Sequence, residues 1–364
     1  MADGHPDDAY RMDGHKLYWH LDRVEAWMRG EPIAPLHVDM GIATGCNFSC
    51  RYCYGMLQGR RGATSGFCMP QEAICRFFSD AKEAGVRSIA LIGEGENTLN
   101  PALYDALDHA RSIDLDISLG TNGLELRRDR LEAALSALRW IRFNISAASE
   151  AGYRWVHGID ADGFRRVREN IAACVDVKRR LGLDTAIGLQ MVLLREGFNE
   201  VVPLARLGRE LGVDYLVIKP CSDTYDNVLD APVLEYQAMD AIFAEAESFS
   251  GDGYNVVIKR NKLDNKGLKD YAVCHGTSFI IAVSGNGNVF PCGHWFKFRN
   301  DEFCMGNIIT ERFRDILASK RYQSVQQRIR TVNVNRDCEM NCRQHYINRF
   351  LYKLSNKPPH INFI

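Results

Sequence analysis

The sequence lacks several features that would assign the protein to a class at once. Its 364 residues contain no run of 18 apolar residues, so we expect no membrane-spanning helix. Acidic and basic residues nearly balance, and a formal net charge of −1 offers no field for nucleic acid or an anionic membrane. Residues 1–8 are polar and acidic, unlike a secretory signal. We therefore expect a cytoplasmic protein with neither nucleic-acid nor membrane partners.

Composition is otherwise that of an ordinary globular protein, with one exception. Hydrophobic residues make up 46% and charged residues 25%, and the length allows one large domain or two of modest size. Cysteine is abundant, because twelve are present, and a reducing compartment does not favour disulfides. These cysteines therefore suggest metal ligands or catalytic thiols.

Three cysteines lie close together near the N-terminus. Cys46, Cys50 and Cys53 have the spacing Cys-x3-Cys-x2-Cys, and no fourth cysteine follows closely. Three thiolates can hold three corners of a four-iron cluster and leave the fourth iron open for a substrate. Zinc sites more often pair their cysteines in two separate knuckles. The spacing thus favours an iron–sulfur cluster over zinc or over cysteines that only fill a core.

With Tyr52 before the third cysteine, the motif resembles the signature of the radical S-adenosylmethionine (SAM) enzymes. The resemblance implies that the open iron binds the amino and carboxylate groups of SAM. One electron from the cluster then cleaves SAM to a 5′-deoxyadenosyl radical, which removes a hydrogen atom from an unactivated C–H bond. It also implies an external one-electron reductant, such as flavodoxin or ferredoxin.

Short β-like runs alternate with amphipathic helical stretches from residue 37 to about residue 221, which predicts parallel strands with helices outside. Expected strands are 37–44, 88–94, 116–121, 141–146, 185–193 and 215–221, and expected helices lie near 70–85, 101–112, 128–139, 161–181, 198–211 and 233–248. Right-handed crossovers would curl six strands into a partial (β/α)6, TIM-like barrel, the fold of the family it resembles. Reactive groups should lie at the carboxyl ends of the strands.

The second strand ends in a segment, residues 92–97, that resembles the family's Gly-Gly-Glu-Pro element. Gly95 would allow close backbone approach to SAM. Glu96 matches the element's glutamate, so a carboxylate or carbonyl there would accept from the SAM ammonium. Two departures are Asn97 in place of proline and the additional acid Glu94.

Polar residues at later strand ends complete the expected SAM site. They are Asn122 in a Thr-Asn-Gly run, Asn144 and Ser146 on one face of the fourth strand, and Gln190 on the fifth. In the family such residues hold the ribose and carboxylate of SAM. The alternative is turn chemistry for Asn122 and hydrogen-bonded core positions for the others.

Four further cysteines, Cys274, Cys292, Cys338 and Cys342, lie in the last quarter of the chain, around a hairpin pattern at 279–290. The layout resembles the twitch domain, the single-cluster relative of the SPASM domain, and implies a closed auxiliary 4Fe–4S cluster. Zinc is the alternative for four cysteines.

These patterns predict three parts. Residues 1–36 form an extension, disordered to about residue 15, with one amphipathic helix from about 16 to 29 that caps the main domain or helps to shape a substrate pocket. Residues 37–250 form the barrel. Residues 251–364 form the twitch domain, with a helix near 310–328, and the tail.

Cys221 is the most informative of the remaining cysteines, the others being Cys68, Cys75, Cys174 and Cys304. Packing is the ordinary role for each of them. Strand alternation puts Val217, Lys219 and Cys221 on one face, and if that face is the lumen, Cys221 points at the substrate. A thiol there gives a hydrogen atom to a substrate radical, as family epimerases do. Lys219 and Glu94 would bind amino or hydroxyl groups or move a carbinol proton.

The first expected function is epimerisation of a carbinol carbon in a small-molecule sugar or aminocyclitol. The layout is similar to that of twitch-bearing relatives in aminoglycoside pathways, namely 2-deoxy-scyllo-inosamine dehydrogenase and radical SAM epimerases. The second is dehydrogenation of such an alcohol, with the auxiliary cluster taking the electron. The third is modification of a peptide precursor, against which residues 1–36 are short for a leader-binding domain. An electron carrier or a zinc-stabilised binding protein would leave the strand-end pattern unexplained.

Overall fold

The structure is a computed structural model that describes residues 10, 14–53, 66–223, 229, 239–260, 262 and 268–363. The segment expected to be disordered, 1–15, lies mostly outside the described residues. Within the described part of the chain, no helix has both the length and the apolar character needed to span a bilayer.

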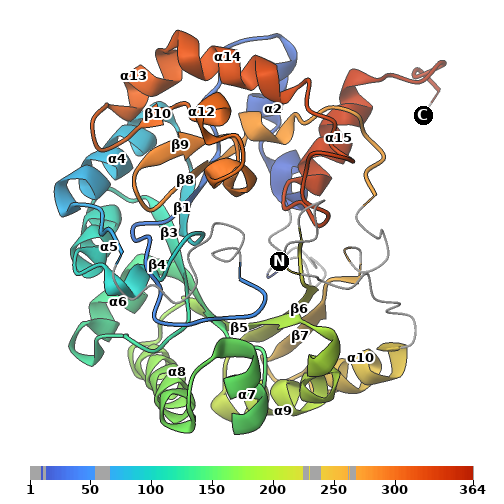
Figure 1. Ribbon diagram of the computed structural model, residues 1–364. Coiled ribbons are helices and arrows are strands. Elements are labelled where there is room, and N and C mark those ends of the chain that lie inside the picture. The colour runs from blue at the N-terminus through green and yellow to red at the C-terminus, as the bar shows by residue number, and fades with distance from the viewer. Residues whose placement is uncertain are drawn as a thin grey trace.

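One ten-stranded sheet runs through the molecule in the order β10-β9-β8-β1-β2-β3-β4-β5-β6-β7 (Figure 1). The strands are β1 (His37–Met40), β2 (Ser88–Leu91), β3 (Asp116–Thr121), β4 (Leu138–Asn144), β5 (Ala186–Leu193), β6 (Tyr215–Pro220), β7 (Asn255–Ile258), β8 (Ile280–Val283), β9 (Asn288–Phe290) and β10 (Gly306–Asn307). All neighbours from β1 to β7 are parallel. The six predicted strands are therefore confirmed. β3 has the predicted bounds, β1, β2, β5 and β6 are shorter at one end, and β4 begins and ends earlier than predicted.

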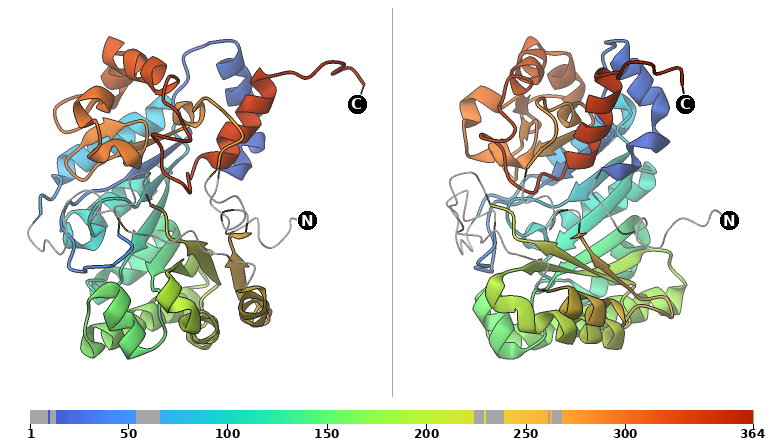
Figure 2. Two further views of the ribbon diagram at one scale, coloured as in Figure 1. Left: turned by 45° about the vertical axis from the view of Figure 1, so that its right-hand side comes forward. Right: turned by 90° about the vertical axis from the view of Figure 1, so that its right-hand side faces the viewer.

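Helices cover one face of the parallel strands (Figure 2). They are α4 (Gln71–Ala84), α5 (Leu103–Ser112), α6 (Leu131–Ala137), α8 (Ala161–Leu181), α9 (Val201–Leu211) and α10 (Asp240–Glu247). Local sequence sets their ends. Asp160 accepts a hydrogen bond from the Gly163 N–H at the start of α8, and Gly182 ends that helix at a φ of 61°, which favours glycine. The helix α7 (Glu150–His157), which follows β4, was not predicted.

The two faces of the strands differ in chemistry. Leu216 and Ile218 of β6 lie in the main hydrophobic core with the covering helices. The opposite face, which we call the lumen face, carries Asn144, Gln190 and Lys219. Asn144 pairs with Gln190 across β4 and β5, and Lys219 of β6 pairs with Val192 of β5. The register thus puts Lys219 on the face opposite Leu216 and Ile218.

The C-terminal part continues the same sheet. The predicted hairpin is present, because β8 and β9 pair antiparallel, but β8 also pairs in parallel with β1. At the other edge β7 pairs with β6, so the sheet extends beyond residue 250. In place of one helix near 310–328 there are α13 (Phe313–Ala318) and α14 (Lys320–Ile329), preceded by α12 (Asn300–Phe303) and followed by α15 (His345–Ser355). The division into domains remains a proposal.

The N-terminal helix is also divided. A 3-10 helix, η1 (His15–Trp19), precedes α2 (Leu21–Met28), and His20 separates them, so the prediction of one continuous helix was wrong. Val24 of α2 forms a small core with Ile347 and Leu351 of α15. The two helices lie side by side in each view (Figures 1 and 2). This helix therefore packs on the C-terminal helix.

A buried carboxylate links α4 to the start of α13, two helices that are far apart along the chain. Asp80 of α4, 1% exposed, accepts hydrogen bonds from the Arg312 guanidinium and, at 3.0 Å, from the Phe313 N–H at the start of α13.

We expect Asp80→Ala to lower the free energy of unfolding by roughly 1–3 kcal/mol, because the Phe313 amide loses its acceptor in a buried place. Thermal unfolding followed by circular dichroism measures this effect. Asp129→Ala, at the exposed pair with Arg127, should leave the midpoint unchanged. Equal midpoints for Asp80→Ala and the unsubstituted protein would contradict the assignment.

Candidate active site

The first cysteine group lies in the loop between β1 and α4, at the carboxyl end of β1. Burial raises the pKa of Cys46 to about 12, with a smaller contribution from Glu96. Burial first, then Cys53 and Cys46, raise the pKa of Cys50 well above its usual value. The three thiols are therefore electrostatic neighbours. No group of three His, Cys, Asp or Glu side chains in the described residues is close enough to hold a single metal ion.

The C-terminal end of α7 holds this loop. The Ser49 N–H donates to the carbonyl of His157 at 3.1 Å, and the Arg51 N–H donates to the carbonyl of Val156 at 2.9 Å. The His157 ring reaches the thiol itself, with Nδ1 at 3.1 Å from Cys50 Sγ. Sequence reasoning missed His157, because no motif surrounds it and its helix was not predicted.

Glu96 fastens the ends of β2 and β3 together. Its Oε1 accepts hydrogen bonds from the Thr98 N–H, the Thr98 hydroxyl and, at 2.7 Å, the Thr121 hydroxyl. Its Oε2 accepts from the Asn122 N–H at 2.7 Å. Most of the acceptor capacity of this carboxylate is therefore used within the protein. Binding of the SAM ammonium at Glu96 stays a prediction.

Gly95 shows why this turn needs glycine. Its φ is 73°, and a Cβ there would lie 2.4 Å from the carbonyl oxygen of Ala43. The turn thus presses directly against the cysteine loop, and the Glu96 N–H donates to the Gly45 carbonyl at 2.8 Å. The close backbone approach predicted at Gly95 is made to the cysteine loop in this structure.

The other predicted SAM-binding residues gather at neighbouring strand ends. Asn122 Nδ2 donates to Asn47 Oδ1 at 2.7 Å and lies 4.0 Å from Cys46 Sγ. Gln190 Nε2 donates to Asn144 Oδ1 at 2.7 Å on the lumen face. These contacts satisfy part of their hydrogen-bonding capacity, as the alternative interpretation of core polar groups requires.

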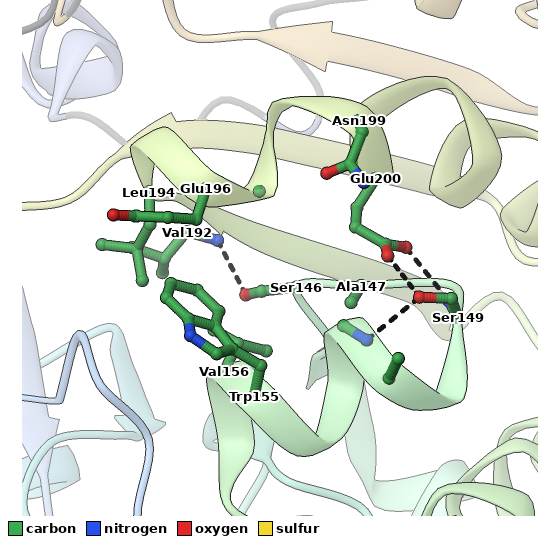
Figure 3. A pocket seen from close by; sticks show the side chains of 13 residues that line it. Ser146, Ala147, Ser149, Trp155, Val156, Val192, Leu194, Glu196, Asn199 and Glu200 are labelled. Carbon is green, nitrogen blue, oxygen red and sulfur yellow. Dashed lines mark hydrogen bonds between the residues drawn. The ribbon is translucent and has the colours of Figure 1, made fainter.

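Ser146 lines a pocket with a volume of about 310 Å³ at the ends of β4 and β5 (Figure 3). Its Oγ accepts from the Val192 N–H at 3.1 Å. Trp155 of α7 stands opposite Leu194 and Glu196, both from the segment after β5. The pocket therefore offers an apolar wall with polar groups at its edge.

The second cysteine group lies around the hairpin and the tail. Burial raises the pKa of Cys292 well above its usual value, and Cys338, Cys342 and Cys274 raise it further. Two amide groups point at these thiols, since the Gln344 N–H lies 3.3 Å from Cys342 Sγ and Asn348 Nδ2 lies 3.6 Å from Cys274 Sγ. All four predicted auxiliary ligands are thus brought into one neighbourhood.

Cys221 lies one residue beyond β6, where its N–H donates to the Leu193 carbonyl at 3.3 Å. Its own carbonyl accepts from Asn341 Nδ2 at 3.2 Å, so it touches the loop between Cys338 and Cys342. Cys174 is fully buried, as the packing interpretation predicts for it.

Lys219 and Glu94 differ in their surroundings. Burial, followed by Lys262 and Arg142, lowers the pKa of Lys219 to about 8. Glu94 is 4% exposed, and its Oε2 accepts from the Gly285 N–H at 3.0 Å. That contact ties the end of β2 to the turn between β8 and β9. It gives Glu94 a structural contact, and the catalytic role suggested by its position at a strand end stays a prediction.

The two cysteine groups predict about eight iron and eight sulfide ions per chain after oxygen-free reconstitution. Replacing Cys46, Cys50 and Cys53 together with alanine should remove about half of each, because the auxiliary ligands remain. Replacing Cys338 and Cys342 should remove the other half. Iron and sulfide analysis with the visible absorption spectrum measures both. Stoichiometric zinc without sulfide in the unsubstituted protein would contradict this expectation.

Comparison with known proteins bears on the same regions. The radical SAM superfamily profile matches residues 40–207, and the SPASM iron–sulfur cluster-binding domain profile matches residues 274–344. A probable GTP 3′,8-cyclase of Saccharolobus islandicus is 30% identical over 186 residues, which are 51% of this chain and 56% of that protein. The chain therefore spans little more than half the length of these curated relatives.

Solved structures show the same fold at low identity. SuiB of Streptococcus suis bound to S-adenosylmethionine has a TM-score of 0.66 and 14% identity, covering 98% of this chain and 82% of that one. Native anSMEcpe with bound AdoMet has a TM-score of 0.52 and 16% identity, covering 88% and 98%. With its cysteine loop, parallel strands and second cysteine group, the chain carries a radical SAM domain and a SPASM-type iron–sulfur domain, a combination that implies SAM and two 4Fe–4S clusters.

Proposed function

We propose that this protein epimerises a carbinol carbon of a sugar or aminocyclitol, with Cys221 as the hydrogen-atom donor. The observation that carries the proposal is the state of Cys221 at the carboxyl end of β6. Burial, with a smaller contribution from Asp223, raises the pKa of this thiol to about 12. A hydrogen-atom donor must keep its S–H bond, and this environment preserves it at neutral pH.

The residues of the first site fit the cofactors. Three cysteines leave one position of a four-iron cluster open, and the Tyr52 hydroxyl beside them is buried without a hydrogen-bond partner among the described residues. Cys46, Cys50 and Cys53 would hold the cluster, and the polar groups at the ends of β2 to β5 would hold SAM. When bound, these cofactors supply a 5′-deoxyadenosyl radical that removes a hydrogen atom from the substrate.

Cys221 would then return a hydrogen atom to the substrate radical. Its S–H bond breaks as a new C–H bond forms at the substrate radical, and the thiyl radical is returned to a thiol by one electron and one proton. A flavodoxin or ferredoxin would supply the electron, and water the proton. Cys221 follows β6, whereas the first cysteine group follows β1. The hydrogen atom would therefore be returned from a different part of the lumen than the part where it is removed. Return from another side would invert the stereocentre.

Lys219 favours a second candidate, dehydrogenation of the same alcohol to a ketone. A lysine with a pKa of about 8 can accept the hydroxyl proton near neutral pH. The electron would pass to the auxiliary cluster, whose ligand loop contacts Cys221 through Asn341. Modification of a peptide precursor is the third candidate. No contact among the described residues favours it. A precursor peptide and GTP should nevertheless be tested as substrates beside the sugars and aminocyclitols.

The Cys221→Ala variant separates the first two candidates. We expect it to cleave SAM to 5′-deoxyadenosine under dithionite as the unsubstituted protein does, but to lose epimerisation at least tenfold, because the S–H donor is absent. Reaction in D2O should place deuterium at one carbon of the epimerised product. Cys304→Ala is the matched control, since that thiol is also partly buried but lies near Gly306. Unchanged epimerisation in Cys221→Ala would remove Cys221 from the mechanism.

The pH profile tests Lys219. If Lys219 is the base, ketone formation should rise with pH and level off above about 8, because the free amine is the active form. Lys219→Met should flatten this rise and lower the rate above pH 8. SAM cleavage in the absence of substrate provides the control for cofactor binding. A Lys219→Met profile with the same rise would show that another group titrates.

A further inference from the structure

The His157 ring bridges the pocket wall and the first cysteine group. It is fully buried at the end of α7. On one side Nε2 accepts a hydrogen bond from the Ser146 N–H at 3.0 Å. On the other side Nδ1 lies 3.1 Å from Cys50 Sγ. Ser146 itself lines the pocket at the ends of β4 and β5.

The first of these contacts fixes the proton on the ring. A backbone N–H can only donate, so Nε2 must be an acceptor and carries no hydrogen. A neutral imidazole has one N–H, which must then be at Nδ1. Nδ1 therefore donates toward Cys50 Sγ, and the doubly protonated ring is excluded because Nε2 could no longer accept.

The surroundings keep the ring in this orientation. Its centroid lies 4.4 Å from that of Tyr153, 5.8 Å from that of Tyr52 and 5.9 Å from that of Phe48. Backbone hydrogen bonds from Ser49 and Arg51 join the cysteine loop to the last residues of α7. The ring cannot turn without disturbing both the loop and the helix, so the direction of its N–H is built into the fold.

We propose that His157 is a positioning residue that donates a hydrogen bond from Nδ1 to the Cys50 thiolate and raises the reduction potential of the SAM-binding cluster. The physical reason is charge. Reduction adds an electron to the cluster, and an N–H donor at a ligand sulfur stabilises the more negative state. The inference depends on the SAM-binding cluster and not on Cys221 or on epimerisation, so the two proposals fail independently.

Two substitutions and one control test this role. His157→Phe keeps an aromatic ring without the donor, and His157→Gln keeps an N–H of similar reach. Tyr153→Phe is the matched control, because the Tyr153 hydroxyl packs beside the same ring and has no hydrogen-bond partner among the described residues. The measurement is a reductive titration of the reconstituted protein, followed by the electron paramagnetic resonance signal that SAM addition alters. Iron content is checked in each variant.

We expect a more negative potential in His157→Phe, seen as an about tenfold smaller ratio of reduced to oxidised cluster at a fixed solution potential. His157→Gln should recover part of the loss, and Tyr153→Phe should titrate as the unsubstituted protein does. A potential in His157→Phe equal to that of the unsubstituted protein, with full iron content, would overturn the proposal.

A second measurement needs no substitution, in case His157→Phe does not retain its cluster. Protein labelled with nitrogen-15 histidine should show, by electron–nuclear double resonance of the reduced SAM-responsive cluster, a weak nitrogen coupling through the Nδ1–H to sulfur contact. Among the described residues, His157 is the histidine within hydrogen-bond distance of a cysteine of the first group. Absence of any histidine coupling would refute the hydrogen bond whatever the variants show.

Discussion

Burial of thiols beside one another is the constraint on which this structure depends. Cys50 and Cys292 are each surrounded by further cysteines, and burial together with those neighbours raises their pKa values far above the usual range. As thiolates without a counter-charge they would repel one another in a medium that solvates charge poorly. Iron ions remove the conflict, because a coordinating thiol is deprotonated and its charge is neutralised by the metal. The rest of the fold holds these thiols in place until that happens.

One continuous sheet provides the support for both groups. β8 pairs in parallel with β1, so the hairpin that bears the auxiliary cysteines begins beside the strand that leads into the first cysteine loop. Glu94 strengthens this junction by accepting from Gly285, and Arg343, adjacent to Cys342, pairs with Asp39 of β1. The two cysteine groups are therefore held in a fixed relation by backbone pairing, the Glu94 hydrogen bond and one partly buried ion pair. Electron or radical transfer between them would need such a fixed relation.

Much of this arrangement could be predicted from the sequence, and the failures have a common cause. Period-two and helical patterns located the six strands and most helices, and the range 161–181 agrees with α8. Those patterns are local, so they could not show that β8 lies next to β1 or that Glu94 binds a hairpin turn. His157 was missed for the same reason. A histidine at the end of a short helix looks ordinary until the fold brings it to Cys50.

In the proposed reactions, the chemistry that follows hydrogen abstraction would depend on a competition between two groups near the end of β6. Lys219 lies on the lumen face of β6, and Cys221 follows two residues later, one residue beyond the strand. A substrate radical near Cys221 can take a hydrogen atom and keep its oxidation level. If it lies nearer Lys219, it can lose the hydroxyl proton, after which an electron leaves more easily. The two outcomes differ in which group the carbinol approaches, not in how the radical is made. In the proposed reactions, burial would keep the thiol protonated and bring the pKa of the lysine to about 8, and substrate orientation would decide between epimer and ketone.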